Sequence, residues 1–222
     1  MKKPLNWFWA LLSFALVLTG SLPAEAQLNR GDFRFSLDTD VISIAHVTID
    51  PDGAPGEAEY MVYGIGPSQL GASQVTQPAS PLGLHMGYVI HPKFVLNFRL
   101  GLGYDVVAPE GGENTRLLAV SLQPGLTIVP LGRKAKLFIA LAPLFQVNRT
   151  KVDDDLSRWL MGGFSAGIGT LIFPTSACSA DLGFFFEGRF GNEKVENEDV
   201  SNTTQHVADL RGVVRLGLSL WR

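Results

Sequence analysis

The sequence predicts an all-β fold, an eight-stranded antiparallel up-and-down barrel that crosses a membrane, with short periplasmic turns and long extracellular loops. Three observations predict it. Segments in which every second side chain is apolar recur along the chain. The connections between these segments alternate between short and long. Charged residues make up 18% of the chain, below the roughly 25% of ordinary soluble domains, so something other than water faces much of the surface.

The alternation is clearest over residues 81–108, PLGLHMGYVIHPKFVLNFRLGLGYDVVA. Large apolar side chains occupy one parity in both halves, whereas the other parity holds mainly glycine and polar residues such as Asn97 and Arg99. His91-Pro92-Lys93 separates the halves, and proline removes a backbone donor and restricts φ, so two strands meet there in a tight turn. The unbroken apolar face is expected to contact lipid. Leu100→Arg should therefore block insertion at a cost of about 2–4 kcal/mol, and Gly101→Ala should crowd the interior.

Residues 1–26 have the pattern of a cleavable signal peptide. Lys2 and Lys3 precede an apolar run over 7–18 that is too short to span a membrane, and Ala24-Glu25-Ala26 suits signal peptidase. The mature chain, 27–222, is expected to be a single barrel domain exported to the outer membrane. Beyond residue 26 no run of about 18 apolar residues occurs, so any membrane passage must use strands.

The net charge excludes a nucleic-acid binder, and the cysteine content excludes a fold held together by internal disulfides. The formal net charge of −3 lacks the basic footprint of a nucleic-acid binder. The single cysteine, Cys178, cannot form an internal disulfide, and no histidine or carboxylate lies beside it in sequence. A small residue at a turn is its expected role.

The other strands show the same alternation. The first, over 31–47, sets Phe33, Phe35 and Leu37 against polar neighbours, and later strands begin near residues 116, 136, 159, 180 and 207, which gives eight with the hairpin. Pro124 lies within the strand from 116, and proline in a ladder is confined to bulges and unpaired positions. The strand over 136–148 is apolar on both faces, so the pattern does not determine its register.

The connections fall into two classes. Those at 91–93, 130–135 and 174–179 are short and neutral to basic, whereas those at 48–80, 106–115, 149–158 and 191–205 are long and mostly acidic. A barrel in a bilayer predicts this alternation and places both termini on the short-turn side. Residues 48–80 are expected to form a long first extracellular loop with one short strand inside it.

Polar residues on the inward parity are expected to fill the barrel. Eight strands enclose little more than room for side chains, so charges inside must form a packed and compensated network, and a wide water-filled pore is excluded. We expect Glu187 to pair with an arginine from a facing strand. The expected interior polar network, together with Gln123, comprises Arg34, Asp38, Asp40, Asn97, Arg99, Glu187, Arg189, Asp209, Arg211 and Arg215.

On these features the chain resembles the small bacterial outer-membrane β-barrel family, which includes OmpA-type and OmpW-type barrels. The resemblance covers residues 31–222 and rests on the strand pattern, the connection lengths and a final strand that ends the chain. It implies contact with outer-membrane lipid and lipopolysaccharide, and insertion by the barrel-assembly machinery. The family usually ends on an aromatic residue, whereas here Trp221 is penultimate and Arg222 is last.

The chemistry-bearing residues do not form a recognisable catalytic motif. None of His46, His85, His91 and His206 has a neighbouring serine and an acidic partner in sequence, so we expect neither an enzyme nor a cofactor. Asp153-Asp154-Asp155 could hold Ca²⁺ or bridge lipopolysaccharide phosphates through divalent ions. It lacks EF-hand spacing, however, so we expect a solvated acidic loop and no metal site.

The apolar part of the first loop, residues 60–70, has two interpretations. The side chains of Tyr60, Met61, Tyr63 and Ile65 form a lid or lateral pocket for a small hydrophobic solute, as the resemblance to OmpW-type barrels implies, or the segment extends the first strand and packs on its neighbours.

Three function classes follow. The leading one is a monomeric, non-enzymatic outer-membrane barrel with an envelope-structural or surface-interaction role through acidic extracellular loops. The second is a narrow channel or transporter for small molecules, hydrophobic ones included, and the third is a lipid A-modifying enzyme. A soluble barrel of the lipocalin type would share the eight strands but turn its apolar face inward.

Overall fold

The computed structural model describes residues 28–51, 58–65, 68–70, 82–107, 115–130, 135–152, 155–196 and 203–222. The predicted signal peptide lies outside these ranges. Every regular element within them is a β-strand. The described part contains no helix of the length and apolarity that a membrane span requires.

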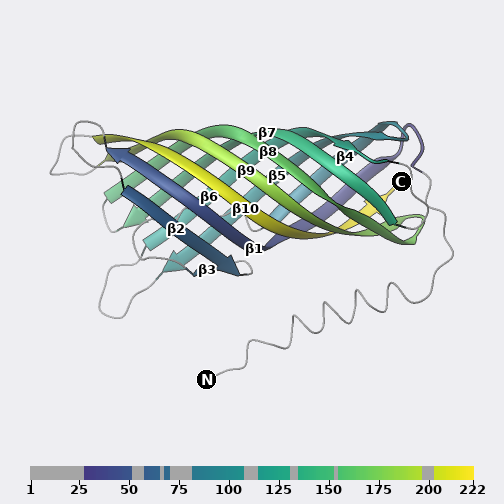
Figure 1. Cartoon of the computed structure of the whole chain (residues 1–222). Coiled ribbons are helices and arrows are strands. Elements are labelled where there is room, and N and C mark those ends of the chain that lie inside the picture. Colours follow the sequence, from purple (N-terminus) through teal and green to yellow (C-terminus); the bar gives the residue numbers. More distant parts are fainter. Residues whose placement is uncertain are drawn as a thin grey trace, which may run out of the picture.

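Ten antiparallel strands form one sheet that closes on itself. They are β1 (Phe33–Pro51), β2 (Ala58–Ile65), β3 (Ser68–Leu70), β4 (Leu82–His91), β5 (Phe94–Val107), β6 (Thr115–Ile128), β7 (Ala135–Val152), β8 (Asp155–Thr175), β9 (Cys178–Glu196) and β10 (Thr203–Trp221). Their order is β10-β9-β8-β7-β6-β5-β4-β1-β2-β3, and β10 also pairs with β1 (Figure 1). β1 and β4 to β10 therefore form a closed ring of eight strands, and the predicted eight-stranded barrel is confirmed.

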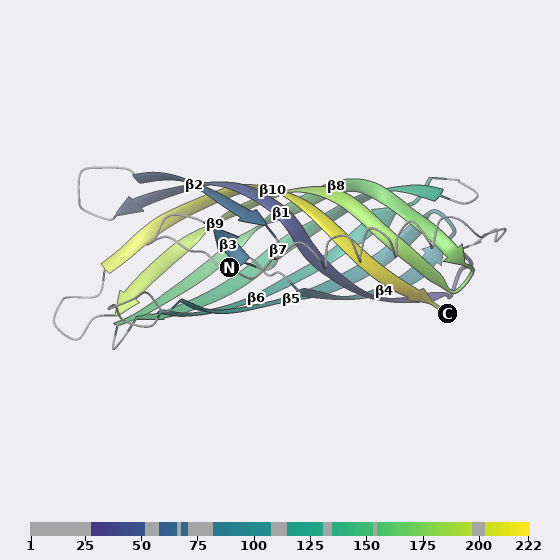
Figure 2. The ribbon, with the colours of Figure 1, turned by 90° about the horizontal axis from the view of Figure 1, so that it is seen from below.

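Figure 2 shows the barrel from a second side, with the C-terminus at the end where β4 meets β5 and β8 meets β9. We call this the short-turn end, and the opposite end the long-connection end. Pairing along β1 differs between the two. Toward the short-turn end, Phe33–Thr39 pair with β4, whereas Ile42–Ile49 pair with β2. A register shift between Asp40 and Ile42 marks a β-bulge, which resets the parity so that Ile42 and Ile44 point outward.

The outer wall is apolar and the inner wall is largely polar. Every closed-ring strand has half-exposed large apolar side chains on its outward parity, such as Phe35, Leu84, Leu141, Phe184 and Leu218. Arginine, aspartate and glutamate side chains on the inward parity are buried. This arrangement is the reverse of a soluble barrel. It suits a bilayer, because the closed ladder satisfies the backbone hydrogen bonds that lipid cannot.

The strands run further than the sequence predicted at the long-connection end. β7 reaches Val152 and β8 begins at Asp155, so the connection predicted at 149–158 is wrong except for 153–154. β9 reaches Glu196 and β10 begins at Thr203, which shortens the connection predicted at 191–205. The predicted loop over 48–80 likewise contains the end of β1, β2 and β3 rather than one short strand.

The reason for this difference is strand length. β8 has 21 residues, which at about 3.3 Å each and a tilt of about 40° span roughly 50 Å along the barrel axis. The apolar band of an outer-membrane barrel is only about 25 Å tall. The strands therefore continue beyond lipid, where outward positions are polar and the sequence no longer alternates.

Two apolar clusters lie inside the barrel, and one extends inward from each end. At the short-turn end the buried residues are Leu28, Val89, Val95, Val129, Phe138, Leu171, Phe173, Phe185, Val213 and Trp221. At the long-connection end they are Ala45, Val47, Ile49, Val62, Trp159, Met161 and Val207. On β9 and β10 the first cluster alternates with the charged residues, because Phe185 follows Asp181 and Val213 lies between Arg211 and Arg215. The guanidinium of Arg215 lies 4.4 Å from the centre of the Phe185 ring.

Candidate functional site

The interior polar network is the candidate functional site. All ten residues predicted for it face the interior, nine of them buried and Asn97 half-buried. With Asp181, the buried network holds five arginines and five carboxylates. They are Arg34, Arg99, Arg189, Arg211 and Arg215, and Asp38, Asp40, Asp181, Glu187 and Asp209. Lys136 on β7 is also buried but is not part of this network. Within the network the two charges are equal in number, as a low-dielectric interior favours.

The middle of the network links four strands. Arg99 on β5 donates through Nη2 to Asp38 Oδ1 at 2.7 Å and through Nε to the same oxygen at 3.1 Å. Arg215 on β10 donates through Nε to Asp40 Oδ1 at 2.7 Å and through Nη2 to Glu187 Oε1 at 3.1 Å. Glu187 thus pairs with an arginine on a different strand, in addition to Arg189 on its own. Each of these carboxylates is held by at least one buried guanidinium.

A glycine makes the Asp38–Arg99 contact possible. A Cβ on Gly83 would lie 2.3 Å from Asp38 Oδ1 and 2.5 Å from Arg99 Nε. His85, two residues further along β4, places Nε2 3.4 Å from Asp38 Oδ2. β4 therefore supplies both the space and a third polar neighbour for this carboxylate.

The polar contacts near the short-turn end depend on Asp181, which is not among the residues predicted from the sequence. Arg34 Nη2 lies 2.5 Å from Asp181 Oδ2, and the guanidinium lies 5.3 Å from the centre of the Trp221 ring. Ser179 donates to Asp181 and accepts a hydrogen bond from Trp221 Nε1 at 2.9 Å. Asp181 shares the parity of Glu187 on β9, so continuing that alternation toward Cys178 would have found it.

The layer toward the long-connection end is built from β7, β9 and β10. Arg189 contacts Glu187, and its Nη1 lies 3.5 Å from Asp209 Oδ2. Arg211 donates to the same Asp209 oxygen at 2.9 Å. Gln146 donates to Asn148 at 2.7 Å, and both are buried. This amide pair was not predicted, because the strand over 136–148 is largely apolar on both faces and its inward side could not be assigned.

The network leaves little open volume. A cavity of about 30 Å³ lies among His85, Asn97, Arg99, Gln123 and other residues of the middle layer. A water molecule needs roughly 10–15 Å³ of such volume, so this cavity accommodates one or two waters and no larger solute.

The residues of the predicted ligand loop lie on β2. β2 pairs with β1 over eight residues, from Ile42↔Ile65 to Ile49↔Ala58. Met61 and Tyr63 are half exposed on the outward face, whereas Val62 between them is buried with the apolar cluster of the long-connection end. The side chains of Tyr60 and Ile65 lie outside the described part. Met61 and Tyr63 therefore point away from the barrel interior.

The remaining sequence candidates are dispersed. His46 lies 3.6 Å from Glu59, His206 lies 2.7 Å from Asn192, and His91 accepts from the Lys93 backbone. Cys178 is half-buried and free. Across the described ranges no three His, Cys, Asp or Glu side chains are grouped to hold a metal ion. Asp153 and Asp154, and the side chain of Asp155, lie outside the description.

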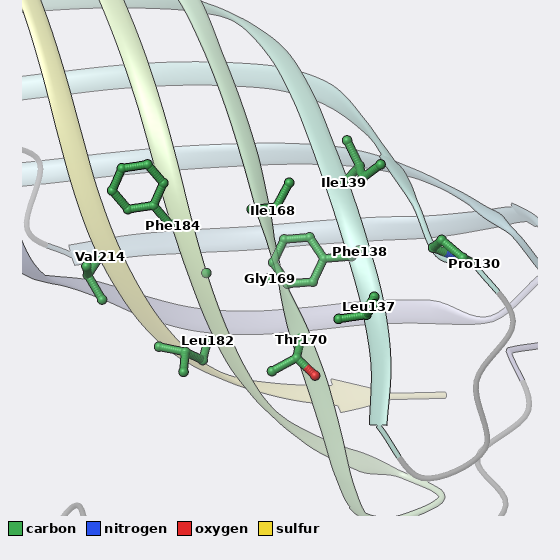
Figure 3. A pocket seen from close by; sticks show the side chains of 11 residues that line it. Pro130, Leu137, Phe138, Ile139, Ile168, Gly169, Thr170, Leu182, Phe184 and Val214 are labelled. Carbon is green, nitrogen blue, oxygen red and sulfur yellow. The ribbon is translucent and has the colours of Figure 1, made fainter.

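An apolar groove of about 620 Å³ lies on the outer wall over β7 to β10. Figure 3 shows Leu137, Ile139, Ile168, Leu182 and Phe184 around it. These side chains belong to the exposed apolar face, so the groove suits a lipid acyl chain rather than a polar solute.

No protein-family model matches the sequence, and no curated protein matches it. Solved structures do. The crystal structure of the outer membrane protein OprG from Pseudomonas aeruginosa is similar with a TM-score of 0.56 and 12% identity, over 90% of this chain and 99% of that one. The solid-state NMR structure of outer membrane protein AlkL in DMPC lipid bilayers gives a TM-score of 0.50 and 13% identity, over 91% of this chain and 95% of that one. The fold is therefore that of the small outer-membrane β-barrels, as the resemblance implied.

Proposed function

We propose that this chain is a monomeric, non-enzymatic outer-membrane β-barrel with a sealed interior, and that it has an envelope-structural or surface-interaction role through its long-connection end. The observation that carries this proposal is the filled interior. Buried charged residues and two apolar clusters together fill the inside of the barrel along its axis.

A solute moving along the axis would have to separate buried ion pairs. Arg99 is bound to Asp38, and Arg215 bridges Asp40 and Glu187, all of them less than 10% exposed. Removing one partner of a buried pair costs about 3–5 kcal/mol, so opening several pairs together is prohibitive at ambient temperature. The network therefore acts as a static plug.

Cellular location is part of the proposal. The signal peptide at 1–26 would direct export, and the barrel-assembly machinery would insert the mature chain. The short-turn end would then face the periplasm, and the long-connection end, with the acidic residues within 48–80 and 106–115, would face outward. The fold shared with OprG and AlkL, both outer membrane proteins, supports the outer-membrane location.

Conductance across a planar bilayer tests the sealed interior. Folded protein, identified by its different gel mobility with and without boiling, is expected to give no channel steps above the background of empty bilayers. Steps whose number rises with the amount of folded protein would refute the plug.

A second candidate, a narrow route for small apolar molecules, is favoured by one observation. At the long-connection end β1 pairs with β2 instead of β4, and the interior there is lined by apolar residues such as Val47, Val62 and Met161. An apolar solute could enter this layer and leave sideways into lipid without crossing the charged layer. Uptake of a labelled apolar solute into proteoliposomes, lost on deletion of residues 57–70, would support this route. Equal uptake by the deletion variant would refute it.

A further inference from the structure

The outward faces of β6 to β9 change from apolar to cationic at the long-connection end. On β7 the outward positions from Leu137 to Val147 are apolar or proline, and Arg149 and Lys151 follow them. Its neighbours repeat the change, since Arg116 precedes Leu118 on β6, Arg158 precedes Leu160 on β8, and Lys194 follows Phe190 and Asn192 on β9. We call Arg116, Arg149, Lys151, Arg158 and Lys194 the basic belt; all five are exposed.

Strand register brings the basic belt together. Arg149 pairs with Arg158, Arg158 pairs with Lys194, and Arg116 pairs with Lys151. Residues directly opposite one another on antiparallel strands have Cβ atoms about 4.5–5.5 Å apart. Four adjacent strands therefore present five cations in two neighbouring rows on one side of the barrel.

The depth of the belt follows from the apolar stretch beneath it. Leu137 and Val147 are ten residues apart, which is about 33 Å along a strand and about 25 Å along the membrane normal at a tilt of about 40°. This equals the height of about 25 Å expected for the apolar band. Arg149, the next outward residue, then lies at the edge of the hydrocarbon, at the level of the lipid headgroups.

Anions bound beside the belt would lower its self-repulsion. Like charges directly opposite on paired strands are destabilising, and here Arg149 faces Arg158, and Arg158 faces Lys194. Arg158 and Lys194 also make other polar contacts. A guanidinium has five N–H donors and an ammonium group has three, so each side chain can bind a protein group and a phosphate together. The opposite side of the barrel differs, because the exposed residues near the same end of β1 and β2 include Asp50 and Glu59.

We propose that the basic belt binds the phosphate groups of lipid A, the glycolipid anchor of lipopolysaccharide in the outer leaflet. The acyl chains of the same lipid would lie on the apolar face below the belt, against side chains such as Leu118, Val147 and Leu160. This proposal rests on the outer-membrane location given above but not on whether the interior conducts. Lipid A would then bind on one side of the barrel, over β6 to β9.

Binding of purified lipid A to the full chain in detergent tests the proposal, with native mass spectrometry as the readout. The wild type is expected to bind bisphosphorylated lipid A at least tenfold more tightly than dephosphorylated lipid A. The variant Arg149→Gln/Arg158→Gln/Lys194→Gln should lose at least tenfold in affinity. The matched control, Arg30→Gln/Lys93→Gln, removes two exposed cations at the short-turn end and should bind as the wild type does.

Three results would overturn the proposal. They are unchanged affinity of the triple variant, equal binding of dephosphorylated lipid A, and displacement of lipid A by millimolar inorganic phosphate, which would indicate a site for the free ion. Gel mobility without boiling checks that each variant is folded. If the triple variant does not fold, Arg149→Gln/Lys151→Gln on β7 takes its place with the same criteria. Because binding is measured without any conductance, a failure here is distinct from a failure of the sealed-barrel proposal.

Discussion

Replacing Glu187 by glutamine tests the plug where it is most deeply buried. Glu187 is 0% exposed, contacts Arg189, and accepts from Arg215 at 3.1 Å and from Gln123 at 3.4 Å. Glutamine keeps the shape but removes the charge, which leaves both guanidinium groups short of a partner. Arg215 retains Asp40 at 2.7 Å and Arg189 retains Asp209 at 3.5 Å. The loss should therefore fall at the lower end of the usual range for a broken buried pair, about 3 kcal/mol.

The free energy of unfolding in urea, measured in lipid vesicles by tryptophan fluorescence and by gel mobility, gives the comparison. Glu59→Gln is the matched control, because Glu59 is an exposed carboxylate 3.6 Å from His46, and its loss should cost less than about 1 kcal/mol. If Glu187→Gln cost no more than Glu59→Gln, the network would contribute nothing beyond a surface pair and the reasoning would be wrong.

Three further changes test other parts of the barrel by the same unfolding measurement. Gly83→Ala should cost about 1–3 kcal/mol, because its Cβ would lie 2.3 Å from Asp38 Oδ1. The control Gly212→Ala, where the atom nearest to the added Cβ is 3.5 Å away, should cost less than half as much. Equal costs would argue against crowding at Gly83. Leu100→Arg, on the lipid face, should cost about 2–4 kcal/mol and reduce the folded fraction after insertion, and full tolerance would reverse the inside and outside assignments. Trp221→Ala should cost about 3–5 kcal/mol, because the buried ring contacts Phe173 and Arg34 and donates to Ser179; a loss below about 1 kcal/mol would mean that this end of the barrel is not packed as described.

The sequence predicts the barrel well where lipid faces the strands. Over β4 and β5 the outward residues are apolar from Leu82 to Tyr104. These residues face lipid, whereas the residues between them face a polar interior, so the two surroundings favour opposite kinds of side chain at neighbouring positions. The same rule explains Trp221. It lies on the inward parity and packs in the short-turn cluster, while Leu220 takes the lipid-facing position.

The prediction fails where the interior is apolar or where the outer face is no longer in contact with lipid. On β7 the inward residues Ala140, Ala142 and Leu144 are as apolar as the outward ones, so the register is determined by pairing with β6 and β8 and not by the pattern. β6 and β7 pair at Leu122↔Phe145 and again at Leu126↔Leu141, and the ladder lapses between them, where Pro124 and Pro143 lack N–H donors. Beyond the apolar band, residues such as Arg149 and Arg158 look like a loop in sequence, although they continue the strands.

The sequence predicts which residues belong to the candidate site but not which of them pair with one another. Parity alone placed Arg34, Arg99 and Arg215 inside the barrel. Which carboxylate each one meets depends on strand tilt and register, which bring Asp38 to Arg99 across 61 positions of sequence and Asp181 to Arg34 across 147. These offsets are not visible in one sequence.

The central claim is that the apolar face of the barrel contacts lipid, and lipid accessibility along β7 tests it most directly. The pattern of accessible positions on this strand distinguishes a membrane barrel from a soluble one, and the sequence did not determine its register. Single cysteines introduced at residues 137–148 in a Cys178→Ser background would carry nitroxide labels in lipid vesicles. The structure predicts that labels at the odd-numbered positions, such as Leu137, Leu141 and Val147, collide with oxygen dissolved in lipid, and that labels at the even-numbered positions do not. Lipid access at the even-numbered positions, or no alternation at all, would contradict a barrel with its apolar face outside and its charges within.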